Sequence, residues 1–228
     1  MLVRMQNTID DTTPLPSLTA WARTFAVVYD PTLWAGERAG ARALRRDLVG
    51  QARGVTVEIG SGTGLNLPYY PDDLDELVLA EPDRSMHVRL EQRLRRSGRL
   101  ARLAAAPAEQ LPFADHSVDT VVSTFVLCTV EDPELALREI VRVLRPDGQF
   151  LFLEHVRSHS ARLAAWQDRL AEPWRRFARG CRCNRATAEL IATSGLAFDE
   201  VHDETWRAMP PIVRPLIAGR ARIGSTNA

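Results

Sequence analysis

The chain has 228 residues, of which 45% are hydrophobic, enough for one α/β domain with a sizeable core. Its 29 basic residues are all arginine and are balanced by 29 acidic residues, which excludes lysine Schiff-base and P-loop lysine chemistry. Because no net charge favours nucleic acid, we expect no nucleic-acid partner and interpret the arginine clusters at 93–102 and 175–185 as solvated helix faces.

The N-terminal fifth is predicted to lie outside the alternating core. Residues 1–16 are expected to be a mobile tail, and residues 17–50 cap helices whose pattern is interrupted at Pro31. No stretch resembles the apolar core of a signal peptide or the roughly 20 apolar residues that span a bilayer. We therefore expect a cytoplasmic location.

A glycine-rich turn follows the first predicted strand, 55–59. Gly60, Gly62 and Gly64 lack Cβ atoms, as a turn requires when its backbone approaches a ligand or adopts a positive φ. Their G-x-G-x-G spacing differs from the G-x-G-x-x-G of dinucleotide sites, because position 65 is leucine. An NAD-dependent oxidoreductase is therefore disfavoured.

Two carboxylates accompany this turn. Glu81 follows the second predicted strand, 77–80, where a carboxylate can accept hydrogen bonds from both hydroxyls of a ribose. Glu58 precedes the first glycine and suits a cationic ligand better than a pyrophosphate. The pattern predicts S-adenosylmethionine as the cofactor and S-adenosylhomocysteine as its product.

The remaining elements alternate. Further strands are predicted near 101–104, 118–123 and 149–154, with helices near 64–69, 84–97 and 133–144. This alternation predicts a parallel sheet with helices on both faces, formed by residues 51–157. Two more strands are expected within 196–228, at Phe198–Trp206 and Leu216–Ile223.

Residues 158–195 are predicted to be a helical lid over the site where the substrate enters. An apolar stripe recurs there at three- and four-residue steps: Leu163, Trp166, Leu170, Trp174 and Phe177. We expect Pro173 to kink or restart this helix, and Asn184 to cap a second helix, 185–193, ended by Gly195. The stripe either packs on the body as a lid, which we favour, or makes the 160–179 helix a basic amphipathic surface on anionic lipid.

The cysteines are too few for a disulfide framework. Cys128, Cys181 and Cys183 are also too unevenly spaced for a four-ligand zinc site, even with His155 or His202 recruited. We expect reduced thiols and no metal.

Four segments in order resemble the class I S-adenosylmethionine-dependent methyltransferases: the run 57–64 with Glu81, the run 108–113, the run 117–122 and the run 138–148. Together they cover about residues 54–156. The resemblance implies a single domain of Rossmann-like α/β fold, with a mostly parallel seven-stranded sheet whose last strand is antiparallel.

The resemblance also implies site residues. Ala108 would hold the adenine through its amide, since Pro107 stands where the family often has an acidic residue. Tyr29 resembles the aromatic residue that closes such sites, and with Phe125 could face the sulfonium through cation–π attraction, although either ring could be ordinary core. The full set of candidate cofactor-contacting residues is Tyr29, Glu58, Gly60, Ser61, Gly62, Thr63, Gly64, Asn66, Glu81, Pro82, Met86, Ala108, Glu109, Phe125 and Leu127.

A narrower resemblance concerns the acceptor. The runs 124–130, 153–156, 180–181 and 212–219 look like the thiol methyltransferases of endoplasmic reticulum membranes, and bacterial phospholipid N-methyltransferases share much of this pattern. The apolar N-terminal anchor of the former family is not seen in this sequence. We predict methyl transfer to a small, fairly apolar acceptor, with a thiol preferred and an amine, hydroxyl or phospholipid headgroup as alternatives.

His155, after the fifth strand, is the candidate catalytic residue, because a neutral imidazole can accept the proton of a thiol whose pKa is near 8.5. Its alternative is a histidine that only bonds the lid. A hypothesis of another class is a non-catalytic cofactor-binding subunit that docks a partner enzyme through the Trp166–Phe177 face.

Overall fold

The structure is a computed structural model that describes residues 20–224. The tail predicted for residues 1–16 lies outside the described residues.

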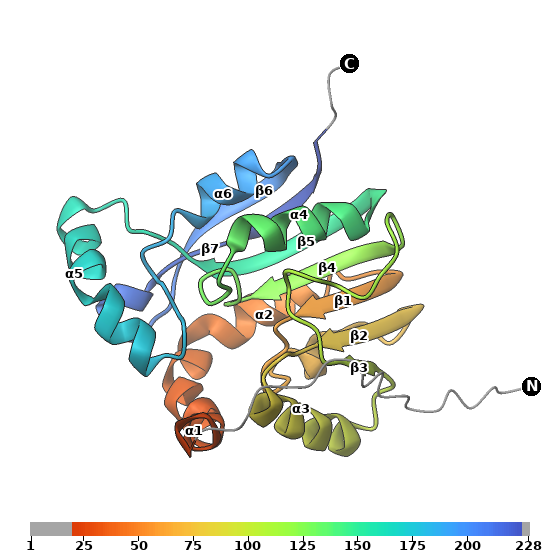
Figure 1. Cartoon of the computed structure of the whole chain (residues 1–228), viewed down its shortest axis with the longest axis horizontal. Helices are drawn as coiled ribbons and strands as arrows, with labels where there is room; N and C mark the ends of the chain where they lie inside the picture. The colour runs from red at the N-terminus through yellow and green to blue at the C-terminus, as the bar shows by residue number, and fades with distance from the viewer. Residues whose placement is uncertain (1–19, 225–228) are drawn as a thin grey trace, which may run out of the picture.

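A seven-stranded sheet runs through the molecule in the order β3-β2-β1-β4-β5-β7-β6 (Figure 1). Its strands are β1 Val55–Ile59, β2 Glu76–Ala80, β3 Arg102–Ala104, β4 Val118–Thr124, β5 Leu144–His155, β6 Leu196–Thr205 and β7 Pro215–Ile223. Strands β1 to β5 pair in parallel, and β7 is antiparallel to both β5 and β6. The predicted mostly parallel sheet with an antiparallel last strand is confirmed. Since β1 lies between β2 and β4, the strand order reverses there, which is where open α/β sheets bind ligands.

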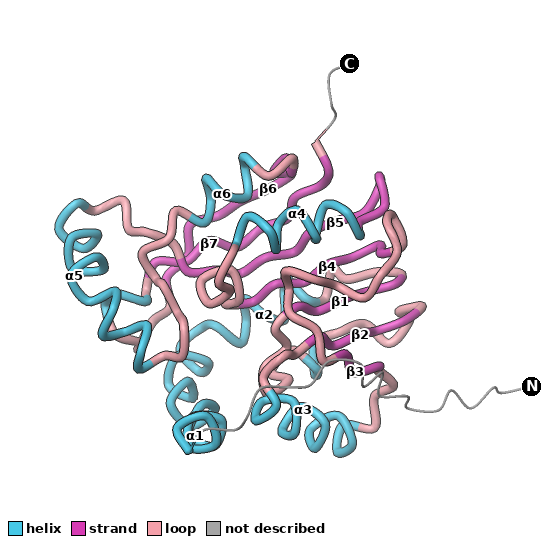
Figure 2. The backbone as a smooth tube through the Cα atoms, in the orientation of Figure 1, coloured by secondary structure: helices cyan, strands magenta, loops and turns pink. Residues whose placement is uncertain are grey.

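Helices cover both faces of the sheet (Figure 2). Helices α4 (Pro133–Val143) and α6 (Thr187–Thr193) share one core with Val57 and Ile59 of β1. Helices α2 (Arg42–Val49) and α3 (Arg84–Ser97) share the other core with alternate strand residues such as Leu77 and Leu79. Because side chains alternate along a strand, Glu58 points away from the α4 side and toward the α2 side.

The cap region departs from its prediction. Helix α1 runs from Ala20 to Gly36 straight through Pro31, so the expected interruption there was wrong. Pro31 removes one helical hydrogen bond in a stretch where Val27 is 54% exposed, so water can serve the freed carbonyl. The break comes instead within a five-residue π-helix, Glu37–Ala41, where Gly40 has φ 146.

Two short helical predictions were also wrong. Residues 64–69 form only a single 3-10 turn, Leu67–Tyr69, with Pro68 inside it. Asn184 caps no helix, because α6 begins after Ala186 and the Asn184 amide donates to Asp168 on the lid instead. Its side chain therefore ties two parts of the lid together.

Helix α5, Ala161–Phe177, lies with α1 beyond the carboxyl ends of the parallel strands (Figure 1). It continues across Pro173 without a restart. Leu163, Leu170 and Trp174 pack on a cluster around Cys128 and Cys181, while Trp166 and Phe177 are about half exposed. Helix α6 packs on β6 and α4, so the second part of the segment 158–195 belongs to the body and not to the predicted lid. Among residues 20–224, no helix is both long and apolar enough to cross a bilayer.

Candidate functional site

The turn after β1 has the glycine geometry expected of a ligand loop. Gly60, Gly62 and Gly64 have φ of 54, 56 and 81, values that side-chain-bearing residues rarely adopt. A Cβ at Gly60 would meet Val126 at 2.7 Å, and one at Gly64 would meet Leu90 at 2.8 Å. At Gly62 it would meet only the Gly60 carbonyl, at 3.9 Å, so the outer edge of the loop is open to a ligand.

Glu81 bridges this loop to the second strand. One carboxylate oxygen accepts a hydrogen bond from the Gly62 N–H at 2.7 Å, and the other accepts from the Asp83 N–H at 2.7 Å. Burial raises the pKa of Glu81 to about 7, although these two backbone donors oppose the rise. Each oxygen keeps a further lone pair, so the carboxylate can still accept from both hydroxyls of a ribose.

Glu58 and Asn66 belong to a buried polar network beneath the loop. Glu58 accepts from the Asn66 amide at 2.9 Å and from the Tyr70 hydroxyl at 2.7 Å. The Arg45 guanidinium donates to the Asn66 amide oxygen at 2.9 Å and to Glu37 at 3.0 Å. Burial raises the pKa of Glu58 to about 7, and the Tyr70 and Asn66 hydrogen bonds and the Arg45 charge oppose this. The network fixes the start of the loop.

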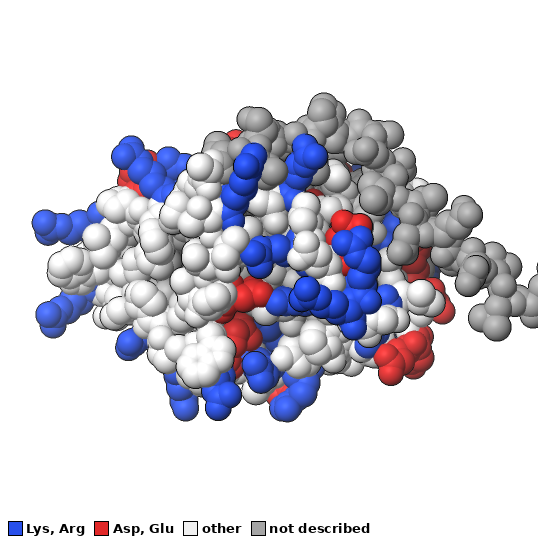
Figure 3. All heavy atoms as spheres, turned by 90° about the horizontal axis from the view of Figure 1, so that it is seen from below, with Lys and Arg blue, Asp and Glu red and all other residues white. Residues whose placement is uncertain are grey.

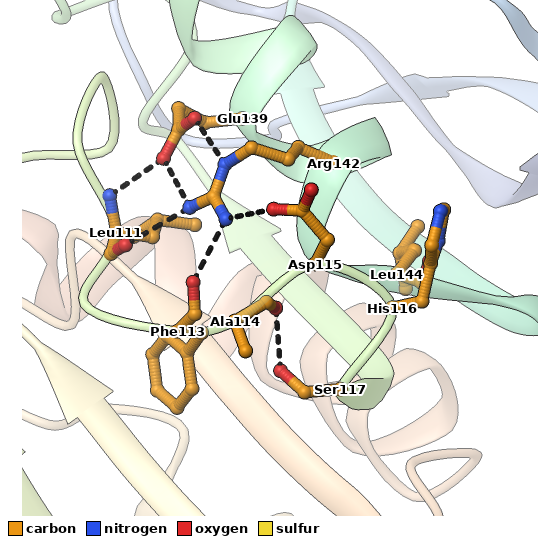
Figure 4. Close-up of polar contacts among 9 residues, drawn as sticks. All are labelled: Leu111, Phe113, Ala114, Asp115, His116, Ser117, Glu139, Arg142 and Leu144. Atoms are coloured by element: carbon orange, nitrogen blue, oxygen red, sulfur yellow. Dashed lines mark hydrogen bonds and ion pairs between the residues drawn. The ribbon is translucent and has the colours of Figure 1, made fainter.

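The loop predicted to face the adenine is held by one arginine of α4 (Figure 4). Arg142 donates to the carbonyls of Leu111 and Phe113 and to the carboxylates of Asp115 and Glu139. Glu139 in turn accepts from the Leu111 N–H at 2.9 Å. This network fixes the backbone just beyond Ala108, which is buried in the core.

Glu109 is engaged elsewhere. Its carboxylate accepts from the N–H groups of Glu131 and Asp132, at 3.1 and 3.5 Å, at the start of α4. Leu127 is fully buried in the α4-side core, and its carbonyl accepts from Arg185. The structure thus gives both residues a supporting position, and their contact with the cofactor stays a prediction.

Helix α1 is fastened to the loop. The Thr63 hydroxyl donates to Asp30 at 2.6 Å, and Arg93 bonds both Asp30 and the Thr63 carbonyl, the latter at 2.8 Å. On the lid side, Arg179 pairs with Asp83 at 2.5 Å. Helix α1 and the segment after α5 therefore both contact the rim of the glycine loop.

Four more predicted residues lie around this rim. Ser61 is buried, and its N–H donates to the Ala80 carbonyl at 3.0 Å. Met86 is buried in the first turn of α3, directly after Pro82 and the capping residue Asp83. Tyr29 lies in α1 with its ring 5.5 Å from Phe25, and burial raises the pKa of its hydroxyl well above the usual value.

Three aromatic rings meet at the carboxyl ends of β4 and β5, two of them stacked and the third tilted against both. Phe125 lies parallel to Trp206 at 4.5 Å and 4.9 Å from His155, with the Arg45 guanidinium 5.0 Å from its centroid. Its φ of 61 is unusual for a bulky residue, so its surroundings hold the backbone in a strained conformation. Burial lowers the pKa of His155 to about 4, which keeps its ring neutral at physiological pH.

The structure brings the predicted residues together in two groups. One comprises the loop with Glu81, and the other contains Phe125 and His155. Sequence reasoning missed Arg45 and Trp206, which link and line these groups, because an arginine in a helix and a tryptophan after a strand carry no local sign of a distant partner. The loop, its open edge and the free lone pairs of Glu81 fit a nucleoside with a cationic centre.

The chain matches known proteins over most of this region. A family model described as "Methyltransferase domain" matches residues 57–152. Human thiol S-methyltransferase TMT1B is 33% identical over 193 residues, which cover 78% of this chain and 77% of that protein. Phosphatidylethanolamine N-methyltransferase of Cereibacter sphaeroides is 31% identical over 120 residues, or 52% of this chain and 59% of that protein.

A solved structure extends the agreement in fold. Geranyl diphosphate C-methyltransferase from Streptomyces coelicolor A3(2), in complex with S-adenosyl-L-homocysteine, covers 82% of this chain and 76% of its own with a TM-score of 0.61 and 15% identity. The domain match, the relatives and the fold together identify S-adenosylmethionine as the cofactor. The chain is an enzyme that belongs to the class I S-adenosylmethionine-dependent methyltransferases.

Proposed function

We propose that the chain methylates the sulfur of a small, fairly apolar thiol. The observation that carries this proposal is the aromatic cluster at the expected acceptor end, where Phe125 and Trp206 stack and a ligand atom of Cys128 lies within 4.8 Å of one on His155. Such surroundings favour an apolar acceptor over a charged one. The similarity to human TMT1B, named as a thiol S-methyltransferase, supports sulfur as the target atom.

The chain's own residues would divide the work by position. The loop Gly60–Gly64 and Glu81 would hold the nucleoside, Ala108 the adenine, and Tyr29 and Phe125 the sulfonium face. The cofactor supplies an activated methyl group with a good leaving group. The protein then needs mainly to align the acceptor sulfur with that methyl group and keep water away.

His155 is the candidate acceptor-side residue. Its neutral ring, 3% exposed, could take a proton from a thiol or otherwise engage the acceptor. Because the pKa of about 4 makes the ring a weak base, we expect it to act mainly by positioning.

Amine acceptors form the second candidate class. The similarity to a phosphatidylethanolamine N-methyltransferase over 120 residues favours a phospholipid headgroup among them. The lid offers exposed Trp166 and Phe177, and arginines stand around and between uncharged areas of the face seen in Figure 3. We nevertheless propose that the enzyme is cytoplasmic and that the α5 surface serves as a lid and does not bind lipid. We therefore expect no co-sedimentation with anionic liposomes at low or high salt.

Two measurements test the proposal. Calorimetry with S-adenosylhomocysteine should give one binding event per chain, and its absence would contradict the loop assignment. A screen of thiols, amines, phenols and phosphatidylethanolamine vesicles with a labelled methyl donor should then show the highest kcat/KM for an apolar thiol. Higher kcat/KM for an amine or a phenol would move the proposal to nitrogen or oxygen.

A further inference from the structure

Three potential metal ligands from distant segments meet beside the aromatic stack. Cys128 follows β4, His155 ends β5, and Cys181 follows α5. One ligand atom from each lies within 4.8 Å of the other two. All three residues are buried, at 1%, 3% and 8% exposure, and both cysteines are free. Within residues 20–224, no other group of histidine, cysteine or acidic side chains comes together in this way.

The donor set suits a borderline-soft ion. Two thiolates and one imidazole form the three-ligand type of zinc site that leaves a fourth position for water or a substrate. Zinc bonds of about 2.3 Å to sulfur and 2.0–2.1 Å to nitrogen place tetrahedral ligands about 3.5–3.8 Å apart. Donors within 4.8 Å of one another therefore need to close by at most about 1.0–1.3 Å.

A second observation points to a missing ligand. The Nδ1 atom of His155 is buried and has no hydrogen-bond partner. The Trp174 indole N–H, which packs on the cluster that contains Cys128 and Cys181, lies against the Cys181 sulfur. Small apolar packing explains buried cysteines, but it leaves the ring nitrogen unsatisfied. A bound ion would engage the imidazole, and its thiolate ligands would offer acceptors to nearby donors such as Trp174.

The cluster also lies on the correct side of the cofactor loop. The ring of His155 is 4.9 Å from Phe125, and Phe125 is 5.0 Å from the Arg45 guanidinium that bonds Asn66 at the end of the loop. One aromatic residue therefore separates the cysteine–histidine cluster from the network under the loop. An ion there would sit at the acceptor end of the site.

We propose that Cys128, His155 and Cys181 bind one Zn²⁺ ion, whose fourth position takes the sulfur of the acceptor. The second half of this inference rests on the proposed thiol acceptor. When the ion binds, the Cys128 and Cys181 thiols each release a proton to water, and the acceptor thiol releases its own proton to water when it coordinates. The thiolate sulfur then uses an electron pair to form the bond to the methyl carbon, while the sulfonium carbon–sulfur bond breaks and leaves its electron pair on the departing sulfur.

In this arrangement His155 is a ligand and takes no proton. The ion has the role that a general base would otherwise have, because it keeps the acceptor sulfur deprotonated at neutral pH. Nearby Cys183 is also fully buried, but it lies outside the three-residue set and so provides a matched control.

The experiment measures metal binding without turnover. The full chain, stripped with a chelator and kept reduced, is titrated with Zn²⁺ by calorimetry, and circular dichroism checks the fold of each variant. We expect one ion per chain, with binding at least about tenfold weaker in Cys128→Ser, His155→Ala and Cys181→Ser and unchanged in Cys183→Ser. Absence of binding, or equal binding in all four variants, overturns the site.

A second measurement uses Co²⁺ in the unmodified chain, so it does not depend on the folding of variants. We expect the visible spectrum of tetrahedral, thiolate-bound Co²⁺, and a change in that spectrum when ethanethiol is added. An octahedral spectrum overturns the site, and a tetrahedral spectrum that ethanethiol leaves unchanged overturns the open fourth position.

The outcomes separate this inference from the proposed function. Thiol methylation by a chain that binds no zinc would refute the metal site and leave the thiol acceptor standing. Zinc binding by a chain that methylates only amines would refute the thiol acceptor and leave the metal site standing.

Discussion

The cofactor end and the acceptor end of the site differ in how their buried polar atoms are paired. Under the glycine loop, both carboxylate oxygens of Glu58 and of Glu81 have hydrogen-bond partners. At the proposed acceptor end, by contrast, His155 Nδ1 and Trp206 Nε1 are buried without a hydrogen-bond partner among the described residues. The proposed nucleoside site is therefore fully paired before any ligand binds, whereas the proposed acceptor site keeps unpaired polar atoms.

Removing Arg45 should cost most, because the cofactor end depends on it. Arg45→Met leaves the buried Glu37 carboxylate without its partner, and we expect about 3–5 kcal/mol less stability to urea unfolding. Arg46→Met is the control, since Arg46 is exposed and pairs only with exposed Asp47. Equal stability of the two variants would mean that the Arg45 network does not stabilise the cofactor end.

The next largest effect is expected at Glu81. Glu81→Gln removes the charge that ribose hydroxyls would meet, so the Kd for S-adenosylhomocysteine should rise about 10- to 100-fold by calorimetry. Glu76→Gln, at the other end of β2 and paired with Arg102, should leave the Kd unchanged. If both variants bind equally well, the ribose lies elsewhere.

The raised pKa of Glu81 predicts a pH dependence of cofactor binding. Because burial raises this pKa to about 7, lowering the pH from 8 to 6 protonates the carboxylate and should weaken binding about tenfold. The sign is opposite for stability: the folded protein keeps a proton that the unfolded chain has lost, so the contribution of Glu81 is present below pH 4.5 and lost as the pH rises through 7. Calorimetry at several pH values tests this, and Glu81→Gln should abolish the dependence of binding.

The smallest effect is expected at the acceptor end. Trp206→Phe deletes an indole N–H that has no partner, and relief of that penalty offsets the lost packing, so stability should change by less than about 1 kcal/mol. A loss of more than about 2 kcal/mol in urea unfolding would mean that the indole is fully engaged. The buried polar atoms of the two ends would then be equally well paired.

The features that the sequence could predict are those that depend on residues close together in the chain. The first strand, the glycine turn and Glu81 were predictable because buried runs, glycine spacing and strand ends are local patterns. The mostly parallel seven-stranded sheet with its antiparallel last strand followed from the resemblance to a known family and is confirmed, whereas the order of the strands comes from the structure alone.

The predictions that failed needed tertiary information. Asn184 has the chemistry of a helix cap, but its side-chain amide donates a hydrogen bond to Asp168 of another helix. Pro31 has the chemistry of a helix break, yet α1 continues through it. The approach of Cys128 to Cys181 joins residues 53 positions apart, so their spacing could not predict it.

The bond between Asp30 and Thr63 ties the first helix to the glycine turn, and Arg93 reinforces it. Exchange of the cofactor for its product and detachment of that helix should therefore be one event. Limited proteolysis would test this. Trypsin should cut after Arg23 and Arg38, within the cap region, more slowly once the product nucleoside is bound. The rate of cleavage in this segment would therefore measure the fraction of enzyme with product bound.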